Sequence, residues 1–176
     1  FGFIKKKKIN TKNRLFKKEM GGGAILDLGC YPVSFSTKIA SLKSSLNIED
    51  VTFSNKKNVF GSTGVEIDSN LNINFNNGFN SEISASFSKN LGKTTEIIGS
   101  SGVITIQDTW TANEAKIILN KGKKDFIFDF NLNKNIYSYQ IETLSDLILN
   151  QKPSKNQILD INQSLFNMQI LDYWKV

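Results

Sequence analysis

The chain has 176 residues, a length typical of one domain, and its 22 basic and 16 acidic residues give a formal net charge of +6. One cysteine and no histidine exclude an internal disulfide, zinc sites and the catalytic triads or dyads that need histidine. No apolar run approaches the ~20 residues of a membrane helix, and we expect no signal peptide, because no apolar segment follows the basic N-terminus. Acid–base chemistry must therefore use Asp, Glu, Lys or Tyr.

The positive charge is concentrated near the N-terminus. Residues 1–18 hold eight of the 22 basic residues and no acid, so the rest of the chain is slightly acidic. Such a run either binds an anion, such as nucleic acid, a phosphate or an acidic substrate, or is a solvated stretch of lysines. We expect no nucleic-acid partner, because the aromatic residues lie mostly at core-like alternating positions and no RNA-recognition signature is present.

The first predicted elements are a strand over residues 1–10, a polar loop over residues 11–20 and a helix from Gly21 to Leu42. Within the helix, apolar residues recur at helical spacing. Pro32 lies inside it, and its ring should disturb the turn around Leu28, so we expect a kink there.

Strict alternation of apolar and polar residues then predicts strands. Residues 70–76 and 82–88 flank a turn at Asn76-Asn77-Gly78, where Asn and Gly tolerate positive φ. Further strands are expected at 96–98, 103–107, 116–120 and 126–130. The alternation indicates a sheet with one buried and one wet face. The wet face is predicted to carry Asn70, Asn72, Asn74, Asn76, Glu82, Ser84, Ser86, Ser88, Asp125 and Asp129, with Ile127 as the apolar exception.

Two helices close the chain, each with an apolar stripe at helical spacing. The stripes are Tyr137, Ile141, Leu144 and Ile148, and Ile161, Leu165, Met168 and Leu171, and Lys152-Pro153 separates them. The expected architecture is α+β: an open, mostly antiparallel twisted sheet with helices packed on one face. We expect residues 1–176 to form a single domain.

The segment from Gly21 to Pro32 is the most informative part of the chain. Its three consecutive glycines let the backbone enter a helix and pass close to a neighbour, and they leave helix N-terminal amides open to an anion or a polar ligand. Four polar residues follow on one side of the helix: Asp27, Tyr31, Ser34 and Lys38. The alternative interpretation is a helix start followed by a solvated polar stripe.

This segment resembles the start of the C-terminal domain of the Gfo/Idh/MocA oxidoreductases, of the glucose–fructose oxidoreductase and dihydrodiol dehydrogenase type. Other segments resemble that domain in the same order along essentially the whole chain. They are Asn13–Phe16, Gly61–Glu66 (with Glu66 in place of the usual Asp), Ile98–Ile104, Tyr139–Glu142 and Leu165–Asp172. The resemblance therefore implies the fold and chemistry of that domain.

The N-terminal half of such enzymes is a Rossmann domain with a glycine-rich dinucleotide turn and a catalytic lysine in an E-K-P motif. Neither motif occurs in this sequence. Because the chain also begins at Phe1 without a methionine, we expect it to be the C-terminal part of a longer protein. The resemblance then implies that NAD or NADP is bound mainly by the absent Rossmann domain. We expect no cofactor and no metal in this chain, and the isolated chain should be inactive.

The resemblance also assigns site residues. Asp27 and Tyr31 match the tyrosine-bearing branch of the family, and the resemblance implies that they are the catalytic residues. Tyr31 would donate the proton if a neighbouring cation lowers its pKa of about 10. Asp27 would orient the substrate hydroxyls or that cation. Arg14, the only arginine, has a planar fork suited to paired hydroxyls or a carboxylate. We predict that Arg14 binds substrate, with a structural salt bridge as an equal alternative. Cys30 is interpreted as a small packed residue.

The resemblance implies a sugar, polyol or related diol substrate and, as partner, the chain's own N-terminal Rossmann domain. It also implies a homodimer through the open sheet face, although that face has too few large apolar groups for an obligate interface. We expect a cytoplasmic protein with no membrane partner. The alternative is a stand-alone, non-catalytic binding or oligomerisation module with the same fold.

Overall fold

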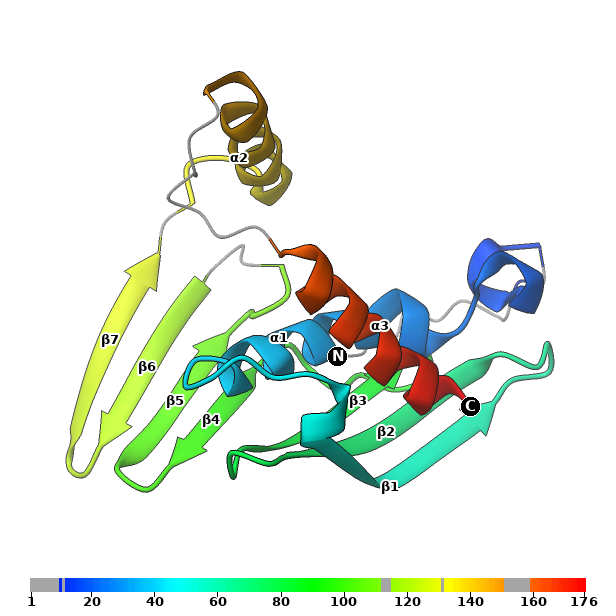
Figure 1. Ribbon diagram of the computed structural model, residues 1–176, viewed down its shortest axis with the longest axis horizontal. Helices are drawn as coiled ribbons and strands as arrows, with labels where there is room; N and C mark the ends of the chain where they lie inside the picture. The colour runs from blue at the N-terminus through cyan, green and yellow to red at the C-terminus, as the bar shows by residue number, and fades with distance from the viewer. Residues whose placement is uncertain (1–9, 11, 112–114, 131, 151–158) are drawn as a thin grey trace. The chain divides into compact units, whose positions relative to one another are not determined.

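The computed structural model describes residues 10, 12–111, 115–130, 132–150 and 159–176 (Figure 1). Its helices and antiparallel sheets confirm the predicted α+β class with an open sheet. The chain divides into two compact units, one made of Phe1–Gly92 and Asp160–Val176 and the other of Lys93–Leu159. The strand expected over residues 1–10 falls almost wholly outside the described residues, and the single domain over 1–176 stays a prediction.

The first unit contains a three-stranded antiparallel sheet in the order β1 (Val51–Phe60), β2 (Glu66–Phe75), β3 (Asn80–Ser86). The predicted alternation is confirmed in β2, where Leu71 and Ile73 are fully buried. The turn between β2 and β3 lies at the predicted place, and Gly78 has a φ of +85° there, which glycine adopts without steric cost.

Strand β1 was not among the predicted strands. After Val51 and Phe53 its sequence becomes polar and loses the two-residue period, and the register with β2 shifts between Ser54 and Lys57. Pairing with β2 over most of its length therefore forms this strand, since its own pattern does not indicate one.

The first helix is preceded by two short 3₁₀ turns, Arg14–Phe16 and Lys18–Met20, in the segment predicted to be a loop. A π-helical turn, Ile25–Gly29, then runs directly into α1 (Cys30–Ala40). The kink expected around Leu28 stays a prediction; the structure has a π turn at that place, which ends three residues before Pro32.

Helix α3 (Ile161–Lys175) begins at a capping box, in which Gln163 N–H donates to Asp160 Oδ1 over 2.8 Å. The predicted apolar stripe of this helix is wrong for three of its four residues: Ile161, Leu165 and Met168 are 70%, 55% and 46% exposed. The residues that face the core are Phe166, Ile170, Leu171 and Trp174. The helix carries two apolar stripes, and the one with the larger aromatic side chains is buried, because it removes more apolar surface from water.

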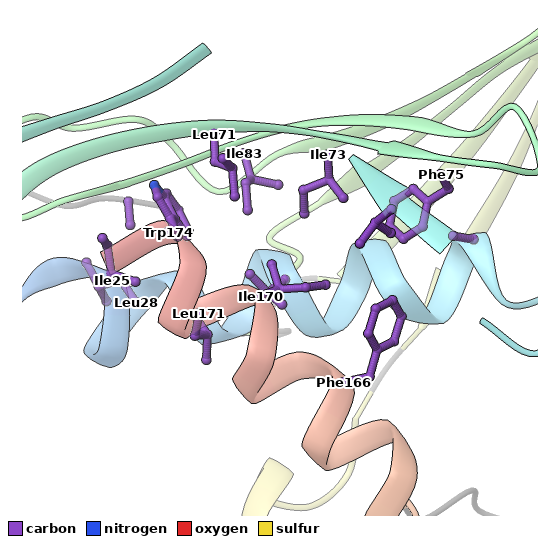
Figure 2. Close-up of a cluster of buried hydrophobic side chains, with 14 of the residues drawn as sticks. Ile25, Leu28, Leu71, Ile73, Phe75, Ile83, Phe166, Ile170, Leu171 and Trp174 are labelled. Atoms are coloured by element: carbon purple, nitrogen blue, oxygen red, sulfur yellow. The ribbon is translucent and has the colours of Figure 1, made fainter. Parts of the chain in front are cut away.

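The core of the first unit lies between one face of the sheet and the two helices α1 and α3. Figure 2 shows Leu71, Ile73 and Ile83 pointing from the strands toward Ile170 and Trp174 of α3. Trp174 is fully buried, and its indole N–H donates to the carbonyl oxygen of Asn70 over 3.1 Å. This contact ties the last helix to the central strand.

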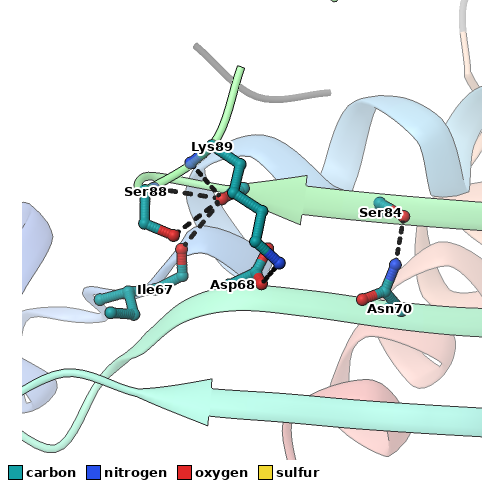
Figure 3. A network of polar contacts seen from close by, with 7 residues as sticks. Ile67, Asp68, Asn70, Ser84, Ser88 and Lys89 are labelled. Atoms are coloured by element: carbon teal, nitrogen blue, oxygen red, sulfur yellow. Dashed lines mark hydrogen bonds and ion pairs between the residues drawn. The ribbon is translucent and has the colours of Figure 1, made fainter. Parts of the chain in front are cut away.

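The opposite face of this sheet is polar, as predicted, with one correction. Asn70 Nδ2 donates to Ser84 Oγ over 2.6 Å across neighbouring strands (Figure 3). Ser86, predicted to lie on the wet face, is fully buried. Its hydroxyl oxygen accepts the backbone N–H groups of Ser88 and Lys89 at 3.1 and 2.9 Å, so Ser86 closes the turn at the end of β3 instead of facing water.

The second unit consists of β4 (Thr95–Gly99), β5 (Gly102–Gln107), β6 (Ala115–Lys121), β7 (Lys124–Phe130) and α2 (Ile136–Asn150). The four strands form one antiparallel sheet in that order, which confirms the predicted strands. Cross-strand pairing aligns Ile106 with Ile117 and Ile117 with Phe128, so one sheet face carries a row of apolar side chains. Among the described residues of this unit only Thr143 is buried.

Helix α2 forms where a helix was predicted, but its stripe is exposed. Tyr137, Ile141, Leu144 and Ile148 are 60%, 65%, 53% and 66% exposed. The predicted break at Lys152-Pro153 lies outside the described residues. In the part of the chain that the structure describes, no helix has the length and apolar character needed to cross a membrane.

Candidate functional site

The glycine turn that opens the helical segment is packed against the chain's own backbone. A Cβ on Gly22 would lie 2.7 Å from the carbonyl oxygens of Leu15 and Lys17 and 2.8 Å from that of Arg14. The N–H of Gly22 donates to Lys17 O and that of Gly23 to Leu15 O, both over 2.9 Å. The close approach that the glycines were predicted to permit is therefore to the segment that carries Arg14.

This packing brings two of the three predicted site residues together. Arg14 Nη2 lies 3.4 Å from Asp27 Oδ1, although the two residues are 13 positions apart. The side chain of Asp27 is 25% exposed and that of Arg14 is 62% exposed. The salt bridge that was one interpretation of Arg14 is present. Because the pair is solvated, it contributes at most about 1 kcal/mol to stability, and the guanidinium remains accessible to a ligand.

Asp27 lies in the π-helical turn and Tyr31 one turn later, in the first turn of α1. Tyr31 is 46% exposed, so its side chain is accessible to solvent from the helix surface. The polar side predicted for this helix is confirmed: Asp27, Tyr31, Ser34 and Lys38 are all half-buried or exposed. We call Arg14, Asp27 and Tyr31 the candidate site. π-helical turns are uncommon and are often found at functional sites.

Three contacts that sequence patterns did not indicate hold the site helix on the core. A Cβ on Gly29 would lie 2.7 Å from Cζ3 of Trp174, so the π turn rests directly on the indole ring. Farther along α1, the hydroxyls of Ser36 and Ser81 lie 2.6 Å apart. Thr37 Oγ1 donates to Asn167 Oδ1, also over 2.6 Å. The only signal in the sequence was that small and hydroxyl residues alternate with apolar ones in this helix.

Cys30 lies between the two predicted catalytic residues. Burial raises the pKa of its thiol, and the negative charge of Asp27 raises that pKa further. The thiol contacts the carbonyl oxygen of Asp27, with Sγ 3.8 Å away. Because the thiolate is the nucleophilic form, a raised pKa makes Cys30 a poor nucleophile, in line with its interpretation as a packed residue.

The arrangement around the candidate site fits neither a metal ion nor a dinucleotide phosphate. Within the described ranges, no group of three or more Cys, Asp and Glu residues is placed to hold a metal ion. The glycine turn does not fit a dinucleotide pyrophosphate, because its free space is filled by the backbone at residues 14–17 and by the carboxylate of Glu66. A carboxylate in that place also repels a phosphate.

The fold is shared with oxidoreductases of known structure. An aldose–aldose oxidoreductase from Caulobacter crescentus, complexed with glycerol, superposes with a TM-score of 0.78 at 17% identity over 98% of this chain and 50% of that chain. A 3-ketoreductase from Actinomadura kijaniata, in complex with NADP and TDP-benzene, gives 0.74 at 14% identity over 92% of this chain and 47% of that chain. The chain thus shares its fold with these two oxidoreductases.

The chain belongs to the GFO/IDH/MocA C-terminal domain family, whose model matches residues 3–105, and this confirms the resemblance. It is 32% identical over 114 residues to the trans-1,2-dihydrobenzene-1,2-diol dehydrogenase of Xenopus tropicalis, covering 64% of this chain and 32% of the relative. The Xenopus laevis enzyme of the same name is 29% identical over 116 residues, with 66% and 33% covered. The chain therefore matches only about a third of the length of these relatives.

Proposed function

We propose that this chain is the substrate-binding and assembly half of a cytoplasmic NAD(P)-dependent oxidoreductase that acts on a sugar, polyol or related diol. The observation that carries the proposal is the Arg14–Asp27 ion pair. Its carboxylate, Asp27, lies one turn before Tyr31, an accessible tyrosine on the same helical segment. Family membership supports the reaction class, and the named relatives, which are diol dehydrogenases, support the substrate class.

In this proposal the nicotinamide cofactor is held mainly by an N-terminal Rossmann domain of the full-length protein. Because the glycine turn at residues 21–23 does not fit the pyrophosphate, we assign the residues of the candidate site to the substrate. Tyr31 Oη exchanges one proton with the reacting oxygen in each turnover. Asp27 accepts hydrogen bonds from substrate hydroxyls, and the exposed guanidinium of Arg14 donates to them. Because the pair is preformed, the substrate is oriented with little loss of side-chain freedom.

The proposal is tested with the full-length natural protein, assayed with sugars, polyols and vicinal diols while nicotinamide turnover is followed. We expect turnover with at least one of these substrates, and none by the isolated 176-residue chain. If the full-length protein turns over no member of any class, the proposed reaction is wrong. That outcome favours a stand-alone, non-catalytic binding or oligomerisation module with this fold.

A homodimer through the open sheet face is part of the same proposal. On the face opposite α1 and α3, Asn70, Asn72, Asn74 and Ser84 are half-buried and Glu82 is exposed. An interface built from these residues is rich in amide and hydroxyl hydrogen bonds and in bridging water. Light scattering at micromolar concentration is expected to give twice the monomer mass. A strict monomer contradicts the dimer. If the Asn72→Arg variant still has twice the monomer mass, the dimer does not form through this sheet face.

A further inference from the structure

A buried carboxylate lies at the start of the central strand and has no place in the chemistry above. Glu66, the first residue of β2, is only 3% exposed. Its Oε2 atom is buried and has no hydrogen-bond partner in the described part of the chain. Burying an ionised group is costly unless its surroundings compensate for it, so the groups packed against Glu66 must account for its position.

The carboxylate lies against the glycine turn of the candidate site. Any Cβ on Gly23 would overlap Oε2 of Glu66, and Gly23 has a φ of +119°, so no other residue fits there without strain. The backbone of Gly23 makes two further contacts. Its N–H donates to the carbonyl oxygen of Leu15, next to Arg14, over 2.9 Å, and its carbonyl oxygen accepts the N–H of Asp27 over 3.3 Å.

Gly23 thus joins the segment that carries Arg14 to the helix that carries Asp27, and Glu66 is the side chain pressed against it. Continuous helical structure begins immediately afterwards, at Ala24, and extends to Ala40. The N-terminal end of a helix carries a partial positive charge that attracts a carboxylate. Glu66 therefore lies beside the end of the helix at which a carboxylate is favoured.

We propose that Glu66 is a positioning residue of the candidate site. Its carboxylate fills the space beside Gly23 and holds the helix start, and with it Asp27 and Tyr31, in the orientation that the reaction needs. This inference rests on the proposed function, because Glu66 contacts no reacting atom and acts through the turn.

The single cysteine of the chain reports on this turn without any need for activity. The contacts run from Glu66 to Gly23, from Gly23 O to the N–H of Asp27, and from Asp27 O to the thiol of Cys30. If the turn loosens, Cys30 becomes more accessible. The rate at which iodoacetamide alkylates it under native conditions therefore measures local opening of this segment.

The experiment compares Glu66→Gln, Glu66→Ala and the control Glu49→Gln in the full-length protein. Glu49 is exposed and makes no contact with the candidate site. We expect both Glu66 variants to raise the alkylation rate of Cys30 at least about fivefold. We also expect kcat to fall by about ten- to a hundredfold, with a smaller change in KM, as for a slightly displaced catalytic group. The control should change neither quantity.

An alkylation rate that neither Glu66 variant changes overturns the inference, whatever the activity. Faster alkylation with an unchanged kcat also overturns it, because Glu66 would then hold the helix without serving the reaction. If Glu66→Ala does not fold, the alkylation rate and kcat of Glu66→Gln test the inference, because glutamine has nearly the same volume as glutamate. Absence of turnover by the unsubstituted protein counts against the proposed function alone. In that case the alkylation rate still shows whether the Glu66 carboxylate holds the turn.

Discussion

Replacing Tyr31 by phenylalanine in the full-length protein is expected to lower kcat by roughly 10²–10⁴-fold, the range for the loss of a general acid. Tyr31 is 46% exposed on the first turn of α1, and the substitution removes only its hydroxyl. The free energy of unfolding should therefore change by less than about 1 kcal/mol. Steady-state kinetics with the best substrate, together with urea unfolding, measure the two quantities.

Tyr173 offers the matched control, because it is also a partly exposed helical tyrosine, with 42% of its surface accessible. Its ring is stacked on Phe53 at a centroid distance of 4.0 Å, and it takes no part in the candidate site. Tyr173→Phe should leave kcat unchanged. If Tyr31→Phe retains a kcat close to that of the unsubstituted protein, the proton comes from another group and Tyr31 has a structural role.

The second large effect is expected in the core. Trp174→Ala should destabilise the protein by about 3–5 kcal/mol, the usual cost of truncating a buried large aromatic side chain. The indole is fully buried, donates to the carbonyl oxygen of Asn70 and lies against Gly29. Its removal leaves a cavity and an Asn70 carbonyl that has lost its indole partner. Urea unfolding followed by circular dichroism measures the loss.

Leu165→Ala, on the same helix, is the control for this substitution. Leu165 is 55% exposed, so its truncation should change the free energy of unfolding by no more than about 0.5 kcal/mol. This pair also separates the two apolar stripes of α3. A larger loss for Leu165→Ala than for Trp174→Ala would mean that the stripe predicted from the sequence faces the core and that the face described here does not.

The core substitution bears on the site because the π turn rests on the indole ring. Gly29 is two residues from both Asp27 and Tyr31, and any side chain at position 29 would meet Trp174. The core and the candidate site therefore share one contact. In this part of the chain, packing that stabilises the fold also fixes the position of the proposed chemistry.

Much of the architecture follows from local sequence. The alternation in β2, the turn at Gly78 and the hairpins of the second unit are properties of short segments, because side-chain direction in a strand repeats every two residues. The polar side of the site helix, with Asp27 and Tyr31 four residues apart, follows from helical spacing in the same way. For such features a prediction needs only the residues of the element itself.

The candidate site is only partly of this local kind. The pairing of Arg14 with Asp27 depends on how closely Gly22 approaches the backbone of residues 14–17, which residue types alone do not specify. The burial of Glu66 against Gly23 likewise joins segments more than 40 positions apart. The spacing of polar residues in the sequence indicated a polar start of the helix. The contacts of Arg14 and Glu66 with that helix start form only in the folded chain.

The sequence by itself determined the α+β class, the hairpins, the helix that carries Asp27 and Tyr31, and the family. Only the tertiary structure decided that β1 is a strand, that α3 buries Trp174 and exposes Leu165, and that Ser86 closes a turn. The physical reason is common to these three features. Each segment allows more than one local arrangement, and contacts made in the folded chain decide among them: strand pairing for β1, buried apolar area for α3, and for Ser86 the hydrogen bond of its hydroxyl to the carbonyl oxygen of Ile67 on the neighbouring strand.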